Sequence, residues 1–161
     1  MKIGILFPTG FTDPGEYLAD ARALEAAGAD CLWIEAGEEA DALTILAALA
    51  AVTGRVSLGI VVASTELARP LLEDPRLPTL QRLARERAIV GVGADQGVVV
   101  AGERWLGVPV PADRAAWQAT LETADRAGAA GVLVPVDPRM IDLLRHPVEE
   151  GDRSDLLIST G

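Results

Sequence analysis

Glu35 is the side chain best placed to do chemistry, because it follows a short apolar run at residues 31–34. A carboxylate at the end of a buried strand can serve as general acid, general base or hydrogen-bond partner for a substrate. We therefore take Glu35 as the candidate catalytic residue. The simpler alternative is a solvated acidic turn that Glu35 shares with Glu38, Glu39 and Asp41.

The single cysteine and single histidine exclude several other chemistries. One of each cannot supply a structural zinc site, and no Ser-His-Asp arrangement surrounds His146, so we predict no metal and no such triad. His146 precedes Pro147 and is more typical of a charge at a helix C-terminus. Cys31 lies in an apolar run, where it resembles a small core residue, and it cannot form an intramolecular disulfide. A reducing, cytoplasmic location fits best.

Two further features could contact a ligand. Gly91 and Gly93 follow an apolar strand and would let a flat ring or a phosphate approach the backbone, although a tight turn explains them equally well. Their spacing to Gly97 is not that of a dinucleotide fingerprint. Arg69, just beyond the third predicted strand, is the arginine best placed for an anion; a solvated surface is the alternative. The three tryptophans are interpreted first as core or interface anchors and second as stacking partners: Trp33, Trp105 and Trp117.

Apolar runs and helix caps predict alternating strands and helices. Helices are expected after Asp13, Asp41 and Asp113, which are typical N-caps, and before Gly28 and Gly128, which are typical stops. The three consecutive valines at residues 98–100 are assigned to a loop. The predicted strands are residues 2–7, 31–34, 56–63, 88–92 and 132–136, with 156–158 as a possible sixth.

The length and the net charge of the chain restrict its possible folds and partners. A chain of 161 residues with 50% hydrophobic residues suits one domain, and a net charge of −10 opposes nucleic-acid binding. No apolar segment approaches the roughly 20 residues of a membrane span. Strands that are apolar on both faces indicate a parallel sheet covered on both sides. A doubly wound sheet and a (β/α)8 barrel both remain possible, and length alone favours the open sheet.

Several strings of residues resemble the luciferase-like monooxygenase family of flavin- and deazaflavin-dependent oxidoreductases. They include KIGILFPTG, ARALEAAGADCLWIE, DALTILAALAAVTGRVSLGIVV and ARPLLEDPRLPTLQRLARERAIVGVGA, which together extend from the start of the chain to residue 94. ERWLGVP at residues 103–109 resembles the segment that precedes the family's next helix. The family's usual histidine near Glu35 is absent, and Arg69-Pro70 stands where His-Pro is common.

The resemblance implies a fold, a cofactor and a set of site residues. Family members are (β/α)8 barrels that hold the ring of FMN or a deazaflavin coenzyme at the C-terminal ends of the strands. We therefore expect an α/β protein of parallel βα repeats, a truncated or condensed TIM-barrel-like architecture with about six strands. The expected cofactor-binding residues are Pro8, Val61, Val62, Ala63, Arg69, Gly91 and Gly93.

The chain is short for such a barrel, and this shapes the expected partners. We treat residues 1–161 as one domain in which 1–127 resembles the front half of the barrel and 128–161 forms a shortened closure, either condensed or rejoined from late strands. An incomplete barrel would leave two unpaired strand edges, which a homo-oligomer or a heterodimer with a full-length paralogue would cover. We expect a small-molecule substrate, no nucleic acid and no membrane. A non-catalytic flavin-binding or partner subunit, and a truncated gene product, are the alternatives.

Overall fold

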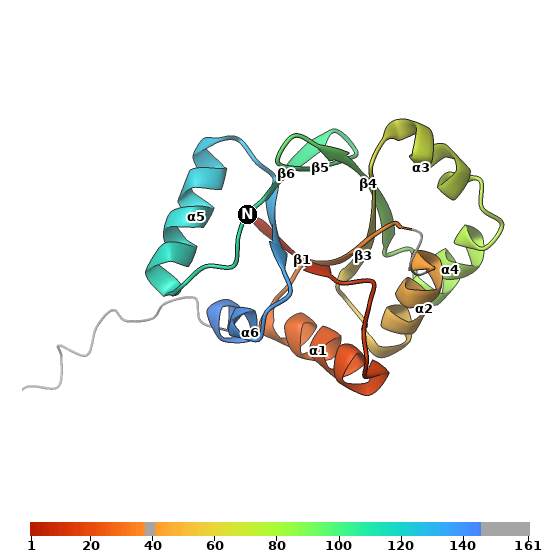
Figure 1. Cartoon of the computed structure of the whole chain (residues 1–161), viewed down its shortest axis with the longest axis horizontal. Helices are drawn as coiled ribbons and strands as arrows, with labels where there is room; N and C mark the ends of the chain where they lie inside the picture. Colours follow the sequence, from red (N-terminus) through yellow and green to blue (C-terminus); the bar gives the residue numbers. More distant parts are fainter. Residues whose placement is uncertain (38–40, 146–161) are drawn as a thin grey trace, which may run out of the picture.

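Short apolar segments of this chain form the strands of a closed barrel, and the segments between them form helices outside it. The computed structural model describes residues 1–37 and 41–145, in which seven strands and six helices are present (Figure 1). In chain order these are β1 Lys2–Phe7, α1 Pro14–Ala27, β2 Cys31–Glu35, α2 Ala42–Val52, β3 Ser57–Val62, α3 Thr65–Leu72, α4 Leu77–Ala84, β4 Ala88–Ala94, β5 Gly97–Val100, β6 Glu103–Gly107, α5 Arg114–Arg126, β7 Gly131–Pro135 and α6 Arg139–Leu144.

The barrel is mixed, which corrects the expectation of purely parallel repeats with about six strands. Strands β1 to β4 pair in parallel, β5 runs antiparallel to both β4 and β6, and β6 is again parallel to β7. The triplet at 98–100, which we had assigned to a loop, lies within β5. Two turns explain this: β4 and β5 are joined through Asp95 and Gln96, and β5 and β6 through Ala101 and Gly102.

Pairing of the first strand with the last closes the sheet. Lys2 of β1 is opposite Gly131 of β7, and the parallel register continues to Leu6 opposite Pro135. The described strands therefore leave no open edge, so the argument for a partner from unpaired edges was wrong. The possible strand at 156–158 and His146 lie outside the described residues.

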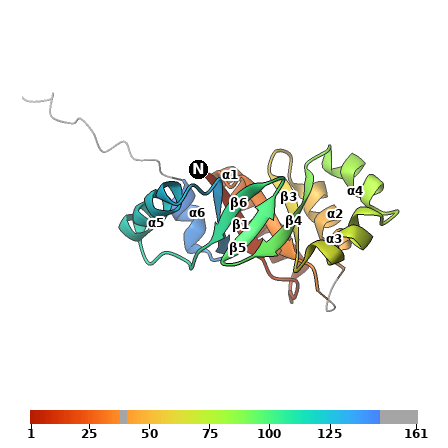
Figure 2. The same ribbon diagram turned by 90° about the horizontal axis from the view of Figure 1, so that it is seen from above.

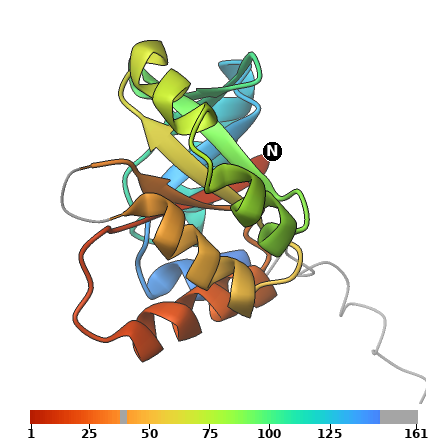
Figure 3. The same cartoon turned by 90° about the vertical axis from the view of Figure 1, so that its right-hand side faces the viewer.

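The helices cover the barrel unevenly. Figure 3 shows α2, α3 and α4 together on one side, and α1 and α6 lie side by side beneath β1. No helix of the described chain lies over the β5–β6 hairpin, which faces the viewer in Figure 2. Helix α3 was not expected as a regular helix because Pro70 lies within it; Pro70 is six residues after the N-cap Ser64.

Two apolar clusters hold the fold together. The larger cluster packs the outward faces of the strands against the helices and includes Leu32, Ile60 and Val134. The smaller cluster fills the barrel interior and includes Cys31, Trp33, Val61, Val98, Trp105 and Leu133. Alternation along each strand explains the division, since successive side chains point to opposite faces.

Candidate functional site

The C-terminal ends of the parallel strands surround a cavity of about 490 Å³. Glu35 ends β2 on the same face as Cys31 and Trp33, so strand alternation directs it to the mouth of the barrel. Val61, two residues after Gly59 on β3, lies on the wall beside it. The lining residues are Leu6, Glu35, Val61, Ala63, Gly93, Ala94, Asp95, Gly97, Val98 and Leu133.

A second cavity of about 590 Å³ adjoins the first, because Leu6 and Glu35 line both. Its other walls come from the segment after β1 and the end of β7: Phe7, Pro8, Thr9, Gly10, Pro135 and Val136. Both volumes fall in the range of about 300–1,000 Å³ that is typical of small-molecule sites. Glu35 thus stands between two lobes, each of which has the size of a ligand pocket.

Tyr17 of α1 fixes the wall of the second lobe. Its hydroxyl donates a hydrogen bond to the carbonyl oxygen of Pro8 at 2.9 Å. Its ring packs edge-on against Phe7, with centroids 5.1 Å apart, and lies 4.6 Å from that of Phe11. Burial raises the pKa of Tyr17 to about 12, so the phenol keeps its proton and remains a donor.

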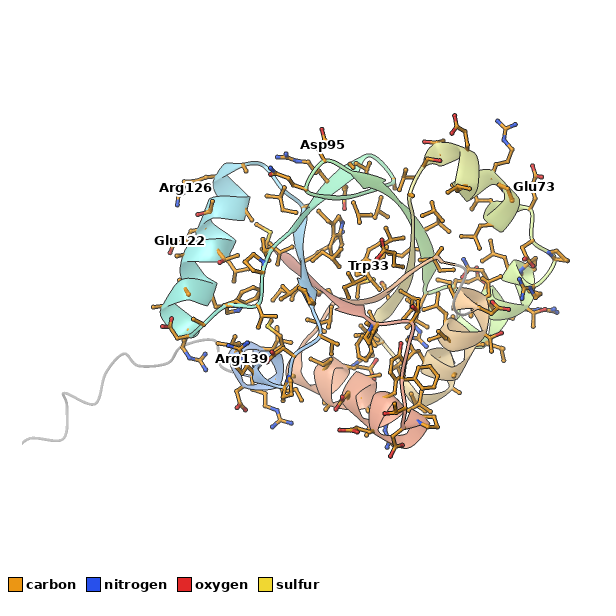
Figure 4. All side chains as sticks on the ribbon, in the orientation of Figure 1. Trp33, Glu73, Asp95, Glu122, Arg126 and Arg139 are labelled. Carbon is orange, nitrogen blue, oxygen red and sulfur yellow. The ribbon has the colours of Figure 1, made fainter. Side chains whose placement is uncertain are left out.

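Two tryptophans fill the barrel interior below the lobes, although neither lines them. Trp33 and Trp105 lie inside the barrel, where Figure 4 shows Trp33 near the centre of the ring of strands. Glycines on neighbouring strands make the space for them: a Cβ at Gly59 would lie 2.1 Å from Cε3 of Trp33, and one at Gly131 would lie 2.7 Å from Cε3 of Trp105. Small residues on the strands and large residues in the lumen therefore seal the barrel below the lobes.

The indole N–H groups of these two tryptophans are unusual. Neither Nε1 of Trp33 nor Nε1 of Trp105 has a hydrogen-bond partner within the described chain, although both are buried. A buried donor without a partner costs about 1–3 kcal/mol, so the packing of the two rings must offset that penalty.

The structure brings together five of the residues singled out in the sequence. Glu35, Val61, Ala63 and Gly93 line the first lobe, and Pro8 lines the second.

The other three candidates lie elsewhere. Val62 points outward into the cluster between sheet and helices. Gly91 lies deeper in the barrel, where a Cβ would be 2.4 Å from Cγ1 of Val98. Arg69 is exposed in the last turn of α3 and lines neither lobe.

Sequence reasoning missed Leu6, Leu133 and Asp95 as lining residues. The first two have a recognisable signal, since each lies two residues beyond a glycine of the inward face, Gly4 on β1 and Gly131 on β7. Asp95 had no such signal in the sequence, because its position depends on the turn that joins β4 to β5.

The charge of the site is negative. Glu35 and Asp95 are the only ionisable side chains among the described residues that line the two lobes. No group of three or more His, Cys, Asp or Glu side chains in residues 1–37 and 41–145 could hold a metal ion. In the same part of the chain, no helix is long and apolar enough to span a membrane.

Comparison with known proteins places these features in a family. The model of the luciferase-like monooxygenases matches residues 1–134. A search of curated proteins found no match. Among solved structures, the monooxygenase RslO1 from Streptomyces bottropensis is similar, with 20% identity and a TM-score of 0.45, over 90% of this chain and 65% of that chain. Because the family match spans most of its length, the chain belongs to the luciferase-like monooxygenase family.

Proposed function

We propose that this protein is a flavin- or deazaflavin-dependent oxidoreductase that acts on a small organic substrate at the C-terminal mouth of its barrel. Membership of the luciferase-like monooxygenases supports oxidoreductase chemistry of this kind. The observation that carries the proposal is the position of Glu35, which lines both lobes of the mouth. One lobe would hold the ring and the other the substrate, with the carboxylate between them.

The first lobe suits the ring of the cofactor. Val61, Ala63 and Leu133 offer apolar surface, and Gly93 has no side chain to stand in the way. When bound, the ring supplies the hydride chemistry, and the protein supplies orientation and the surrounding charges. Val61, Ala63 and Gly93 would hold it there.

The second lobe suits the substrate. Pro8 and Pro135 form stiff apolar walls, and the hydrogen bond from Tyr17 to the carbonyl of Pro8 keeps one of them in place. Glu35 would accept a proton or a hydrogen bond from the polar atom of a substrate in this lobe. The apolar walls would exclude water from that atom.

A second candidate function is cofactor or ligand binding without turnover. The observation that favours it is the small set of ionisable groups in the mouth, Glu35 and Asp95 alone among the described lining residues. Among these described lining residues, Glu35 is the proton-transferring group near the centre and none is a histidine. A binding subunit that works with a full-length paralogue would need no more.

Self-association is part of the proposal, supported now by apolar surface rather than by strand edges. Leu67, Leu72 and Leu83 on α3 and α4 are 57–58% exposed, and Leu83 borders an apolar groove of about 340 Å³ between α2 and α4. We expect light scattering at micromolar concentration to show a dimer that Leu83→Glu dissociates. A monomer in the unchanged protein would contradict this, and Leu121→Glu on α5, a partly buried leucine on another helix, is the comparison variant.

The central test is a titration of the protein with riboflavin and with its deazaflavin analogue, followed by ligand fluorescence. We expect saturable micromolar binding that Ala63→Phe abolishes by filling the first lobe. Ala119→Phe, an equal enlargement on the exposed face of α5, should leave binding unchanged. Absence of binding up to about 1 mM, which corresponds to roughly 4 kcal/mol, would contradict the proposal.

Turnover separates the two candidate functions. Glu35→Gln keeps the size of the side chain and removes its charge. If Glu35 transfers a proton, the variant should retain flavin binding and lose at least about 100-fold in the rate of flavin-dependent substrate oxidation. Binding without any turnover in the unchanged protein would favour the second candidate.

A further inference from the structure

Among the described residues that line the mouth of the barrel, there is no arginine or lysine side chain to hold a phosphate. Glu35 and Asp95 are the only charged residues among the described lining residues, and both are acidic. Asp95, labelled in Figure 4, lies in the turn between β4 and β5. Proteins bind phosphate with arginine or lysine side chains or with backbone N–H groups at helix N-termini. Neither an arginine nor a lysine is among the described lining residues.

Three of the helix N-termini at this end have side-chain acceptors, whereas the short helix α6 has no side-chain cap at Pro138. Helices α1, α2 and α5 begin at the mouth end of the barrel, because each follows a strand whose C-terminus lies there. The caps are carboxylates: Asp13 accepts from the amides of Gly15 and Glu16, Asp41 from those of Leu43 and Thr44, and Asp113 from that of Ala116. A phosphate at any of these N-termini would have to displace a negative charge.

Helix α3 begins two residues after Ala63, which lines the first lobe. Its N-terminus is no better suited to an anion. Its cap Ser64 accepts a hydrogen bond from the amide of Leu67, and its first turn carries Glu66. Glu66 already provides the negative charge that a helix N-terminus favours. An approaching phosphate would be repelled by it.

The arginines nearest these loops are paired. Arg76 forms ion pairs with Asp41 and with Asp74, and Arg139 pairs with Asp137 at 2.9 Å. The hydrogen bonds from Arg76 and Arg139 lower the pKa of Asp74 and Asp137, so these carboxylates keep their charge and retain their partners. Neither arginine lines the two lobes.

We propose that the site selects its ring ligand by charge: it accepts an unphosphorylated, neutral or cationic heterocycle and rejects the phosphorylated form of the same ring. This inference rests on the proposed function, since it concerns the same two lobes. The apolar walls fit the ring, whereas the carboxylates do not fit the phosphate. Repulsion between these two carboxylates and a phosphate dianion bound at the mouth would weaken binding about tenfold at low ionic strength.

Riboflavin and FMN form the matched pair that tests the inference, because they differ only by the phosphate. We expect riboflavin to bind about tenfold more tightly than FMN in 20 mM salt, and the difference to shrink at about 0.3 M salt as the charges are screened. FMN binding as tight as or tighter than riboflavin binding would overturn the inference and leave the proposed function intact. Failure of both flavins to bind would overturn both.

Variants locate the charges that cause the discrimination. Asp95→Asn, alone and combined with Glu35→Gln, should raise the ratio of FMN affinity to riboflavin affinity several-fold. Glu122→Gln removes the same charge on the outer face of α5, away from the lobes in Figure 4, and should change neither affinity. Glu35 and Asp95 are both exposed, so we expect thermal unfolding to show that the variants fold. An equal ratio of the two affinities in the double variant and the unchanged protein would contradict the assignment.

Discussion

The indole rings of Trp33 and Trp105 meet edge to face inside the barrel, with centroids 5.6 Å apart and planes inclined at 75°. This is a favourable geometry for aromatic pairs and contributes about 0.5–1.5 kcal/mol beyond the burial of their surface. The pair comes from β2 and β6, on different parts of the barrel wall. Its ring edges reach glycines on the neighbouring strands, so the filling of the barrel interior depends on the absence of side chains there.

Gly59→Ala should destabilise the protein by about 1–3 kcal/mol, because the new Cβ would lie 2.1 Å from Cε3 of Trp33 and the ring cannot move freely. Urea unfolding measures the loss. Gly54→Ala is the matched control, since no atom lies within 4 Å of its added Cβ. Equal stability of the two variants would show that Trp33 has room to shift.

Glu25→Gln should lower stability by about 1 kcal/mol at neutral pH, and less in acid. The carboxylate accepts hydrogen bonds from the backbone amides of Gly54, Arg55 and Val56, at the entry to β3. Partial burial opposes ionisation, but these three bonds together lower the pKa of Glu25 below its ordinary 4.5.

A lowered pKa fixes the sign of this pH dependence. The stabilisation by Glu25 is fully present above pH 4.5 and is lost as the pH falls through the lowered pKa of the folded state. Unfolding curves of the unchanged protein and of Glu25→Gln should therefore converge in acid. Glu122→Gln on α5 provides the comparison, and a constant difference at every pH would contradict the role of the charge.

Tyr17 leads to a prediction about the stability of the protein at alkaline pH. It is the only tyrosine in the chain, so absorbance near 295 nm reports its ionisation alone. Burial raises its pKa from 10.0 to about 12, and stability that is present below pH 10.0 should fall as the pH rises through this interval. A phenol that titrates near 10 in the folded protein would show that the Pro8 contact is open.

Tyr17→Phe tests the contact directly. Loss of the hydrogen bond to the carbonyl of Pro8 should cost about 1 kcal/mol and loosen the wall of the second lobe. Substrate affinity should fall more than flavin affinity, because the first lobe does not include Pro8.

Cys31 should resist thiol reagents until the barrel unfolds. It is 1% exposed within the lumen, and desolvation raises the pKa of its thiol, so little thiolate is present at neutral pH. Its reaction with a disulfide reagent should follow the unfolding transition in urea. Rapid reaction without denaturant would contradict the closed barrel.

Local signals were sufficient to predict most elements. The caps Asp13, Asp41 and Asp113 are confirmed by the hydrogen bonds they accept, and Gly28 ends α1 with a φ of 110°. These features depend on residues close in sequence, which is why they are readable without the fold. Glu35 lines the first lobe, as its place at the end of a strand suggested, whereas Val61 was expected there from the family resemblance.

The β5–β6 hairpin could not be predicted in this way. Its turn places Ala101 and Gly102 at φ of 49° and 86°, a two-residue turn with both central residues left-handed. Asn-Gly is the common sequence for such a turn, and alanine rarely adopts this conformation, so the local signal was weak. Closure of the sheet was also beyond local reasoning, because it depends on pairing between Lys2 and Gly131, which are far apart in sequence.

The bare hairpin makes the barrel wall one polypeptide layer thick along one side. Helices α2, α3 and α4 pack against β3 and β4, whereas Figure 2 shows no helix outside β5 and β6. Such a ladder opens with less loss of apolar contact than its helix-covered neighbours. The amide protons of β5 and β6 should therefore exchange with solvent sooner than those of the helix-covered strands β3 and β4.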